Sequence, residues 1–279
     1  MKITFLGTTT LMFDDGVDQI LFDAHLSRPS MFTMLFKKFN TDTRIVDYIL
    51  QKHNISRLKA IFVSHSHYDH VLDAPYIANK TGAVIHGSKS TINYAIGNSV
   101  PVKQLKEFKD GSEFTVGNYK IKIFASKHSK PKWYNNDIGQ EIEKPFSLPA
   151  SRKSFKEGGS FDFLVENAEK KYLIRPSFNY VKGELDNIDA YIMFLGIAGI
   201  SKSSKLMREN FFKETIAKVK PKYVVPIHWD NFMTPLDKPL KTMPRVLEDT
   251  DIAMYMLTRY CEDNNITNFV QLPLTYFET

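Results

Sequence analysis

Residues Ser64-His65-Ser66-His67-Tyr68-Asp69-His70 place three histidines and an aspartate within a few positions of one another. They follow an apolar run that predicts a buried strand over 58–64. In an extended loop, His65 and His67 point to the same side because successive side chains alternate. Imidazole nitrogens suit zinc, and an aspartate adds negative charge. The stretch therefore predicts a metal site, in which Asp69 and His70, after a turn, face a neighbouring ion.

Two histidines farther along the chain fit the same site. His128 comes a short turn after a strand expected over 119–124, and His228 directly follows a strand expected over 223–227. Side chains at the carboxyl ends of strands can share one crevice. Each histidine alone would more often be structural, but the motif at 65–70 favours a role for both in the metal site.

The rest of the chain alternates between strands and helices. The pattern predicts further strands over 2–7, 19–23, 83–86, 113–116, 161–166, 172–174 and 190–195, and helices over 30–39, 43–53, 73–81, 90–96, 209–219 and 245–264. We expect the first two strands to form a hairpin around the turn signal at 14–16. Two strand-rich halves flanked by helices indicate one α/β (α+β) sandwich domain over 1–279, with the helices outside.

Two segments of the sequence each allow two interpretations, one structural and one functional. Phe32, Leu35, Phe36 and Phe39 fall on one face of the helix expected over 30–39. Such a face usually packs against a core, and the alternative is an apolar lid or an entry for an acyl chain. Residues 130–159 form an irregular insertion with prolines and paired glycines, which is either a functional loop or a disordered insertion.

Composition narrows the class of protein. The net charge is +6, from 37 basic and 31 acidic residues, without a long basic run. This charge permits an anionic small-molecule substrate and carries no strong nucleic-acid signal. The single cysteine, Cys261, excludes an internal disulfide and a cysteine metal cluster. We expect a cytoplasmic protein without a membrane span, because neither a signal peptide nor a long apolar run is present.

The His-x-His-x-Asp-His motif after a strand resembles that of the metallo-β-lactamase superfamily. Asp23 at the end of an early strand, His128 and His228 extend the resemblance over nearly the whole chain. The segment 226–232 is similar to the ascorbate-phosphate lactonase-like and N-acylphosphatidylethanolamine phospholipase D-like branches. The resemblance implies a four-layer αβ/βα sandwich with its site at the edge between two sheets.

The resemblance also implies the ligands of one or two zinc ions, with Mn²⁺ or another divalent metal as alternatives. One ion would be held by His65, His67 and His128, and the other by Asp69, His70 and His228. Asp69 and His228 are the residues expected in catalysis, with Asp69 as ligand or proton shuttle. Asp23 is expected to orient a ligand histidine, and the alternative is a simple role in a turn.

One departure from the family pattern affects the second ion. Most dinuclear members carry a bridging aspartate after the strand that corresponds to 172–174, where this chain continues Arg175-Pro176-Ser177. We expect weaker binding of the second metal, with Ser177 as a poor substitute for the acid. Arg175 is expected either to point away or to bind an anionic substrate. His25 and Trp133 are further candidates, for the site rim and for the pocket lining.

These observations predict a hydrolase that uses a metal-activated water on a small-molecule ester, lactone or phosphodiester. A nuclease of the ribonuclease Z type is one alternative, which the lack of a strong basic patch disfavours. The other alternative is a non-catalytic metal-binding protein, which the missing bridging acid suggests.

Overall fold

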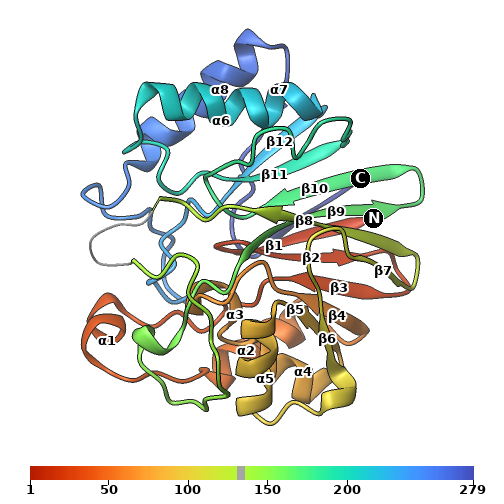
Figure 1. Ribbon diagram of the computed structural model, residues 1–279, viewed down its shortest axis with the longest axis vertical. Helices are drawn as coiled ribbons and strands as arrows, with labels where there is room; N and C mark the ends of the chain where they lie inside the picture. The colour runs from red at the N-terminus through yellow and green to blue at the C-terminus, as the bar shows by residue number, and fades with distance from the viewer. Residues whose placement is uncertain (131–135) are drawn as a thin grey trace.

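Two seven-stranded mixed sheets stack face to face in the computed structural model, which describes residues 1–130 and 136–279 (Figure 1). The first sheet has the order β14 (Thr275–Glu278), β1 (Lys2–Gly7), β2 (Thr10–Asp14), β3 (Gln19–Phe22), β4 (Leu58–Phe62), β5 (Val84–Gly87), β6 (Leu105–Glu107). The second has the order β13 (Thr267–Asn268), β12 (Tyr223–Ile227), β11 (Ile192–Gly196), β10 (Lys170–Arg175), β9 (Ser160–Asn167), β8 (Tyr119–Ser126), β7 (Glu113–Val116).

Helices cover the outer faces of both sheets. Figure 1 shows one group below the first sheet and another above the second. The expected four-layer αβ/βα sandwich is therefore confirmed. The first group comprises α2 (Thr43–Lys52), α3 (Tyr68–Val71), α4 (Ala74–Thr81) and α5 (Lys89–Gly97), and the second comprises α6 (Lys205–Glu214), α7 (Ile216–Val219) and α8 (Thr250–Asp263).

An aromatic core fills the space between the sheets. Phe13 of β2 packs edge-on against Phe194 of β11, with ring centroids 5.9 Å apart. The rings of Phe22 of β3 and Phe163 of β9 are tilted by 48° to each other, with centroids 5.2 Å apart. All four side chains are buried. Because each aromatic side chain buries about 150–250 Å² on folding, this layer contributes a large share of the folding free energy.

The expected hairpin between the first two predicted strands is wrong. An additional strand, β2, lies between β1 and β3 and pairs antiparallel with both. The turn signal at 14–16 is real, but it joins β2 to β3. The sequence Thr10-Leu-Met-Phe-Asp14 is nearly all buried, so it lacks the alternation of polar and apolar residues by which a half-exposed strand is usually found.

The helix expected over 30–39 is shorter, and its expected packing is wrong. It is α1 (Met31–Phe36), none of whose residues is buried. The side chains of Phe32 and Phe36 are 60% and 72% exposed. Phe39 is buried, but it lies beyond the helix in extended backbone.

Most of the insertion lies within the described residues. Its described part, 136–159, contains the short 3-10 helix η2 (Arg152–Ser154) and no α-helix or strand. It is tied to the first sheet's helical layer, because Phe39 and Ala150 exchange two backbone hydrogen bonds of 2.9 and 3.1 Å.

Two other expected helices differ at their limits. The one expected over 209–219 is divided into α6 and α7 at Thr215, and the one expected over 245–264 begins only at Thr250. None of the helices in the described ranges combines the length and the apolar character that a membrane crossing requires.

Candidate metal centre

The His-rich loop is held in place by a buried carboxylate at the end of β3. Asp23 accepts a hydrogen bond of 2.7 Å from the backbone N–H of Ser64 and one of 2.9 Å from its hydroxyl. Thr9 donates a third, of 2.6 Å. Asp23 is fully buried, so these bonds compensate the cost of removing its charge from water. These hydrogen bonds fix the backbone where β4 ends and the His-rich motif begins.

His65, His67 and His128 form the first group of potential ligands. One ring nitrogen of each lies within 4.8 Å of the others. The Nδ1 of His67 is 3.2 Å from the Nε2 of His128. The Nε2 of His65 is buried and has no hydrogen-bond partner in the described part of the chain. A buried ring nitrogen without a partner, beside two others, is what a metal ligand looks like without its ion.

Hydrogen bonds on the far side of two of these rings fix their tautomers. The Nδ1 of His128 lies 2.9 Å from the carbonyl oxygen of Ser129, to which it donates. The Nε2 of His67 lies 3.1 Å from the carboxylate of Asp137. With the protons held there, the lone pairs of His67 Nδ1 and His128 Nε2 face each other. These residues therefore fit a divalent cation.

The protonation states agree with this arrangement. Burial, together with the neighbouring imidazoles, lowers the pKa of His65 well below 6.5. Burial and the nearby His67 lower the pKa of His128 to about 3. Both rings are therefore neutral near pH 7, and the neutral imidazole is the form that binds a metal.

Asp69, His70 and His228 form the second group. The Oδ2 of Asp69 is 3.7 Å from the Nε2 of His70 and 3.5 Å from that of His228. Burial raises the pKa of Asp69, but His70 and His228 outweigh it and hold the pKa well below 3.8. Asp69 is consequently a carboxylate at neutral pH, and it gives this group the negative charge that favours a cation.

Asp23 has a second function in this group. Its Oδ2 lies 2.7 Å from the Nδ1 of His70, so the Nε2 of His70 faces Asp69. Burial lowers the pKa of His70, but Asp23 and Asp69 outweigh burial and raise it. The two carboxylates thus favour positive charge on or beside His70. The rings of His65 and His70 are 3.7 Å apart, which places the two groups side by side.

His228 reaches the second group through a strained turn. It follows β12 with a φ of 58°, in the left-handed region that non-glycine residues rarely occupy. Its N–H donates to the carbonyl of Thr8, and Thr8 N–H donates to Asp230, 2.8 Å away. Asp230 also pairs with Arg28, at 2.6 Å. The strain is thus held by a buried network around His228, as is common at functional sites.

Arg175 occupies a different position from that expected of a substrate-binding residue. Its Nε donates to Asp162, 2.6 Å away, and both side chains are 2% exposed. Of the two expected positions, this pair agrees with the one in which Arg175 points away from the metal groups, and it disagrees with binding of an anionic substrate. Its Nη2 donates to the carbonyl of Asn179, whose amide donates to the carbonyl of His128.

The other residues that the sequence suggested for the site lie in different places. Ser177 is buried and its side chain makes no hydrogen bond to either group within the described ranges. His25 belongs to neither group, because its Nε2 lies 3.1 Å from the carbonyl of Phe232 and its ring packs edge-on against Tyr68. Trp133 lies outside the described residues.

Asp137 is the residue that sequence reasoning missed. It lies in the insertion, 70 positions from His67, and no spacing rule connects them. The insertion approaches the motif closely elsewhere too, since Ser66 N–H donates to the carbonyl of Glu157. Gly158 has a φ of 68°, and a Cβ there would lie 2.5 Å from Ser66 Oγ. The paired glycines of the insertion were the available signal of this close approach.

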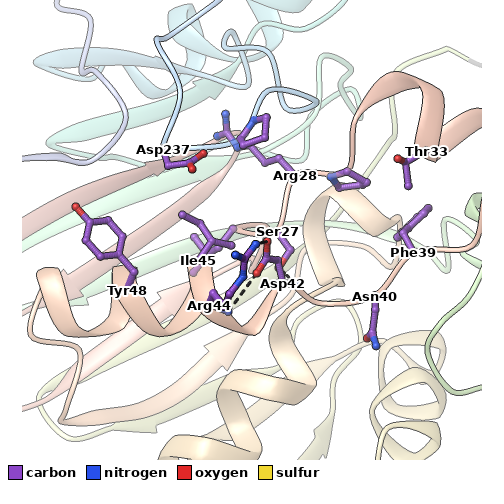
Figure 2. Close-up of a pocket in the computed structure, with 13 residues that line it drawn as sticks. Ser27, Arg28, Thr33, Phe39, Asn40, Asp42, Arg44, Ile45, Tyr48 and Asp237 are labelled. Atoms are coloured by element: carbon purple, nitrogen blue, oxygen red, sulfur yellow. Dashed lines mark hydrogen bonds and ion pairs between the residues drawn. The ribbon is translucent and has the colours of Figure 1, made fainter.

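A cavity of about 550 Å³ lies outside these two groups. It is lined by α1, α2 and the segment around Pro235, and its described lining includes none of the six clustered side chains. Figure 2 shows Arg44 turned toward Asp42 on one of its walls. The candidate metal centre, which is defined by the donor atoms of these six side chains, is therefore separate from this cavity.

Comparisons with known proteins agree with this geometry. A family model described as a beta-lactamase superfamily domain matches residues 18–229. A UPF0173 metal-dependent hydrolase from Carboxydothermus hydrogenoformans is 24% identical over 232 residues, which cover 83% of this chain and 86% of that protein. A protein of the same description from Chloroflexus aurantiacus is 33% identical over 81 residues, 29% of this chain and 33% of its own length.

A solved structure shows the same fold. Igni18, described as a metallo hydrolase from Ignicoccus hospitalis, has a TM-score of 0.61 at 15% identity and covers 100% of this chain and 98% of its own. The family model spans well over half of the chain and includes both groups of potential ligands. This chain therefore belongs to the beta-lactamase superfamily.

Proposed function

We propose that the chain is a metal-dependent hydrolase that cleaves an ester, lactone or phosphodiester bond in a small molecule. The observation that carries the proposal is the convergence of ring nitrogens from His65, His67 and His128 beside a second group that contains Asp69. The relatives that are described as metal-dependent hydrolases support it. Zn²⁺ is the ion that we expect, because imidazole and carboxylate ligands suit it, with Mn²⁺ as the alternative.

Each group of side chains has a separate task in this proposal. The imidazoles of the first group and Asp69, His70 and His228 of the second would hold the metal. When bound there, a divalent ion would lower the pKa of a coordinated water to roughly 7 and polarise the bond to be cleaved. Asp69 is ionised at neutral pH, so its carboxylate can accept a proton. Asp23 and Asp137 orient His70 and His67.

A second candidate function is metal binding without catalysis. The sequence Arg175-Pro176-Ser177 favours it, because it offers no acid at the position where a bridging carboxylate would neutralise two adjacent cations. Hydrolysis of a substrate by the metal-loaded protein distinguishes the two candidates.

The test is hydrolysis of a panel of lactones, esters and phosphodiesters by purified, zinc-loaded protein. We expect activity toward at least one class, and its loss in His67→Ala. His53→Gln is the matched control, because His53 caps α2 and belongs to neither group. Loss of the activity after chelation and its return with zinc would support the proposal. Metal-loaded protein that is inert toward the whole panel would favour the non-catalytic function.

A further inference from the structure

The short helix α1 presents an apolar surface to solvent. Of its six residues, four have large apolar side chains with high exposure: Met31 (39%), Phe32 (60%), Leu35 (50%) and Phe36 (72%). The rings of Phe32 and Phe36 lie 5.3 Å apart and form one ridge. In Figure 1, α1 projects from the body of the molecule, apart from the other helices. Leaving this surface in water is unfavourable, which calls for an occupant.

A side-chain cap begins α1, and contacts with the insertion anchor the chain after its end. At its start, the side chain of Ser30 accepts a hydrogen bond from the N–H of Thr33. After its end, Phe39 pairs with Ala150 and stacks on Phe155, with ring centroids 5.8 Å apart. The exposed ridge is therefore held on a firm base rather than carried by a free loop, so little ordering entropy is lost when it binds.

Charge next to the ridge favours an anionic partner. Lys37 and Lys38 follow α1 directly, are both exposed, and form no ion pair within the described ranges. Lys37 lies over the ring of Phe32, 5.4 Å from its centroid. The adjacent cavity does not change this balance, because its Arg44 is paired with Asp42. The chain as a whole carries a net charge of +6.

The size of the surface distinguishes between possible occupants. Four partly exposed apolar side chains offer on the order of 400 Å², since an aromatic side chain contributes about 150–250 Å² when fully buried. A stable protein interface needs about 800 Å² on each partner. A ridge of this size is too small for a dimer but suits insertion among lipid headgroups, where lysines at its edge meet anionic lipid.

We propose that α1 is a docking element for an anionic lipid membrane. Phe32, Phe36 and Leu35 insert into the interface, and Lys37 and Lys38 contact the headgroups. Binding in this way is independent of the proposed hydrolysis, so either could fail without the other.

The test is co-sedimentation of the full chain with vesicles of phosphatidylcholine alone and of phosphatidylcholine mixed with phosphatidylglycerol. We expect binding to the anionic vesicles that weakens as salt increases. Phe32→Ser/Phe36→Ser should weaken it at least about tenfold, because each ring loses apolar contact with lipid. Lys37→Gln/Lys38→Gln should reduce the preference for anionic lipid about tenfold or more.

The matched control is Val102→Ser/Val246→Ser, which removes apolar side chains that are 77% and 85% exposed away from α1. It should bind as the wild type does. Because all the altered side chains are exposed, thermal unfolding should be nearly unchanged. The proposal would be overturned by a lack of binding to anionic vesicles, or by equal binding of Phe32→Ser/Phe36→Ser. A wild-type dimer that this double variant converts to a monomer would also overturn it, and would assign the ridge to a second copy of the chain.

Discussion

His67 and Asp137 are separated by 70 positions, yet their side chains meet in the buried interior beside the first group of potential ligands. The motif could be predicted from the sequence because its histidines and its aspartate are local. The partner of His67 could not, because an acid in an irregular insertion has no pattern that points to its contact. The two alternatives for Arg175 could not be separated for the same reason, since its partner, Asp162, lies on the neighbouring strand.

The contact between Asp137 and His67 leads to a prediction about metal affinity. Asp137→Asn should weaken zinc binding about 10–100-fold, because the carboxylate fixes the ring and increases the basicity of its Nδ1. Competition with a chromophoric chelator measures the affinity directly. Asp237→Asn removes an equal charge from an acid that is 56% exposed, and it should leave the affinity unchanged. Equal affinity of Asp137→Asn and the wild type would show that the contact does not orient His67.

The buried pair of Arg175 and Asp162 leads to a prediction about stability. Arg175→Met should lower the free energy of unfolding by about 3–5 kcal/mol, because it leaves the Asp162 carboxylate buried without its partner. The double variant Asp162→Leu/Arg175→Met should recover much of this loss, as measured by urea unfolding. If the single variant were as stable as the wild type, the side chain of Arg175 would have to be free in solution.

At the scale of the elements, the strands that carry the metal ligands were the most predictable. β4 and β12 are covered on both faces, so they appear in the sequence as short apolar runs that end at a histidine-rich loop or at His228. α1 was the least predictable, because the amphipathic pattern of a helix does not say whether a partner covers its apolar face. β2 was missed because full burial removes alternation.

The stacking of His86 of β5 on Phe62 of β4 leads to a prediction about the pH dependence of stability. His86 lies 4.3 Å from Phe62, nearly parallel to it, and burial lowers the pKa of His86 to about 4. In the unfolded chain, His86 binds a proton with a pKa near 6.5, so the unfolded state takes up the proton first as the pH falls. The folded protein therefore has its full stability above about pH 6.5 and loses stability as the pH falls toward 4. Between about pH 7.5 and about pH 5, the loss amounts to about 2 kcal/mol.

His86→Phe keeps an aromatic ring in this stack and removes the proton-binding site. Urea unfolding at the two pH values should show a pH dependence that is smaller by about 2 kcal/mol than that of the wild type. An unchanged pH dependence would mean that His86 does not remain neutral in the folded protein.

At the scale of the whole molecule, the sandwich followed from two strand-rich halves with helices outside each. Each half supplies part of the candidate metal centre: β3 and β4 of the first sheet lead to Asp23 and the motif, and β8 and β12 of the second lead to His128 and His228. Neither sheet alone could assemble the site. The substrate could not be predicted in this way, because loops and insertions determine which molecule fits against the metal.

The most direct test of the account is the zinc content of purified, tag-free protein, measured by elemental analysis after zinc loading and removal of loose metal. We predict about two equivalents in the wild type, and about one in each of His128→Ala and His228→Ala, because each variant disrupts one of two adjacent sites. His53→Gln should retain the wild-type content. A wild-type protein that retains no zinc, or two variants that both retain the full wild-type amount, would contradict the assignment of these six side chains to a metal centre.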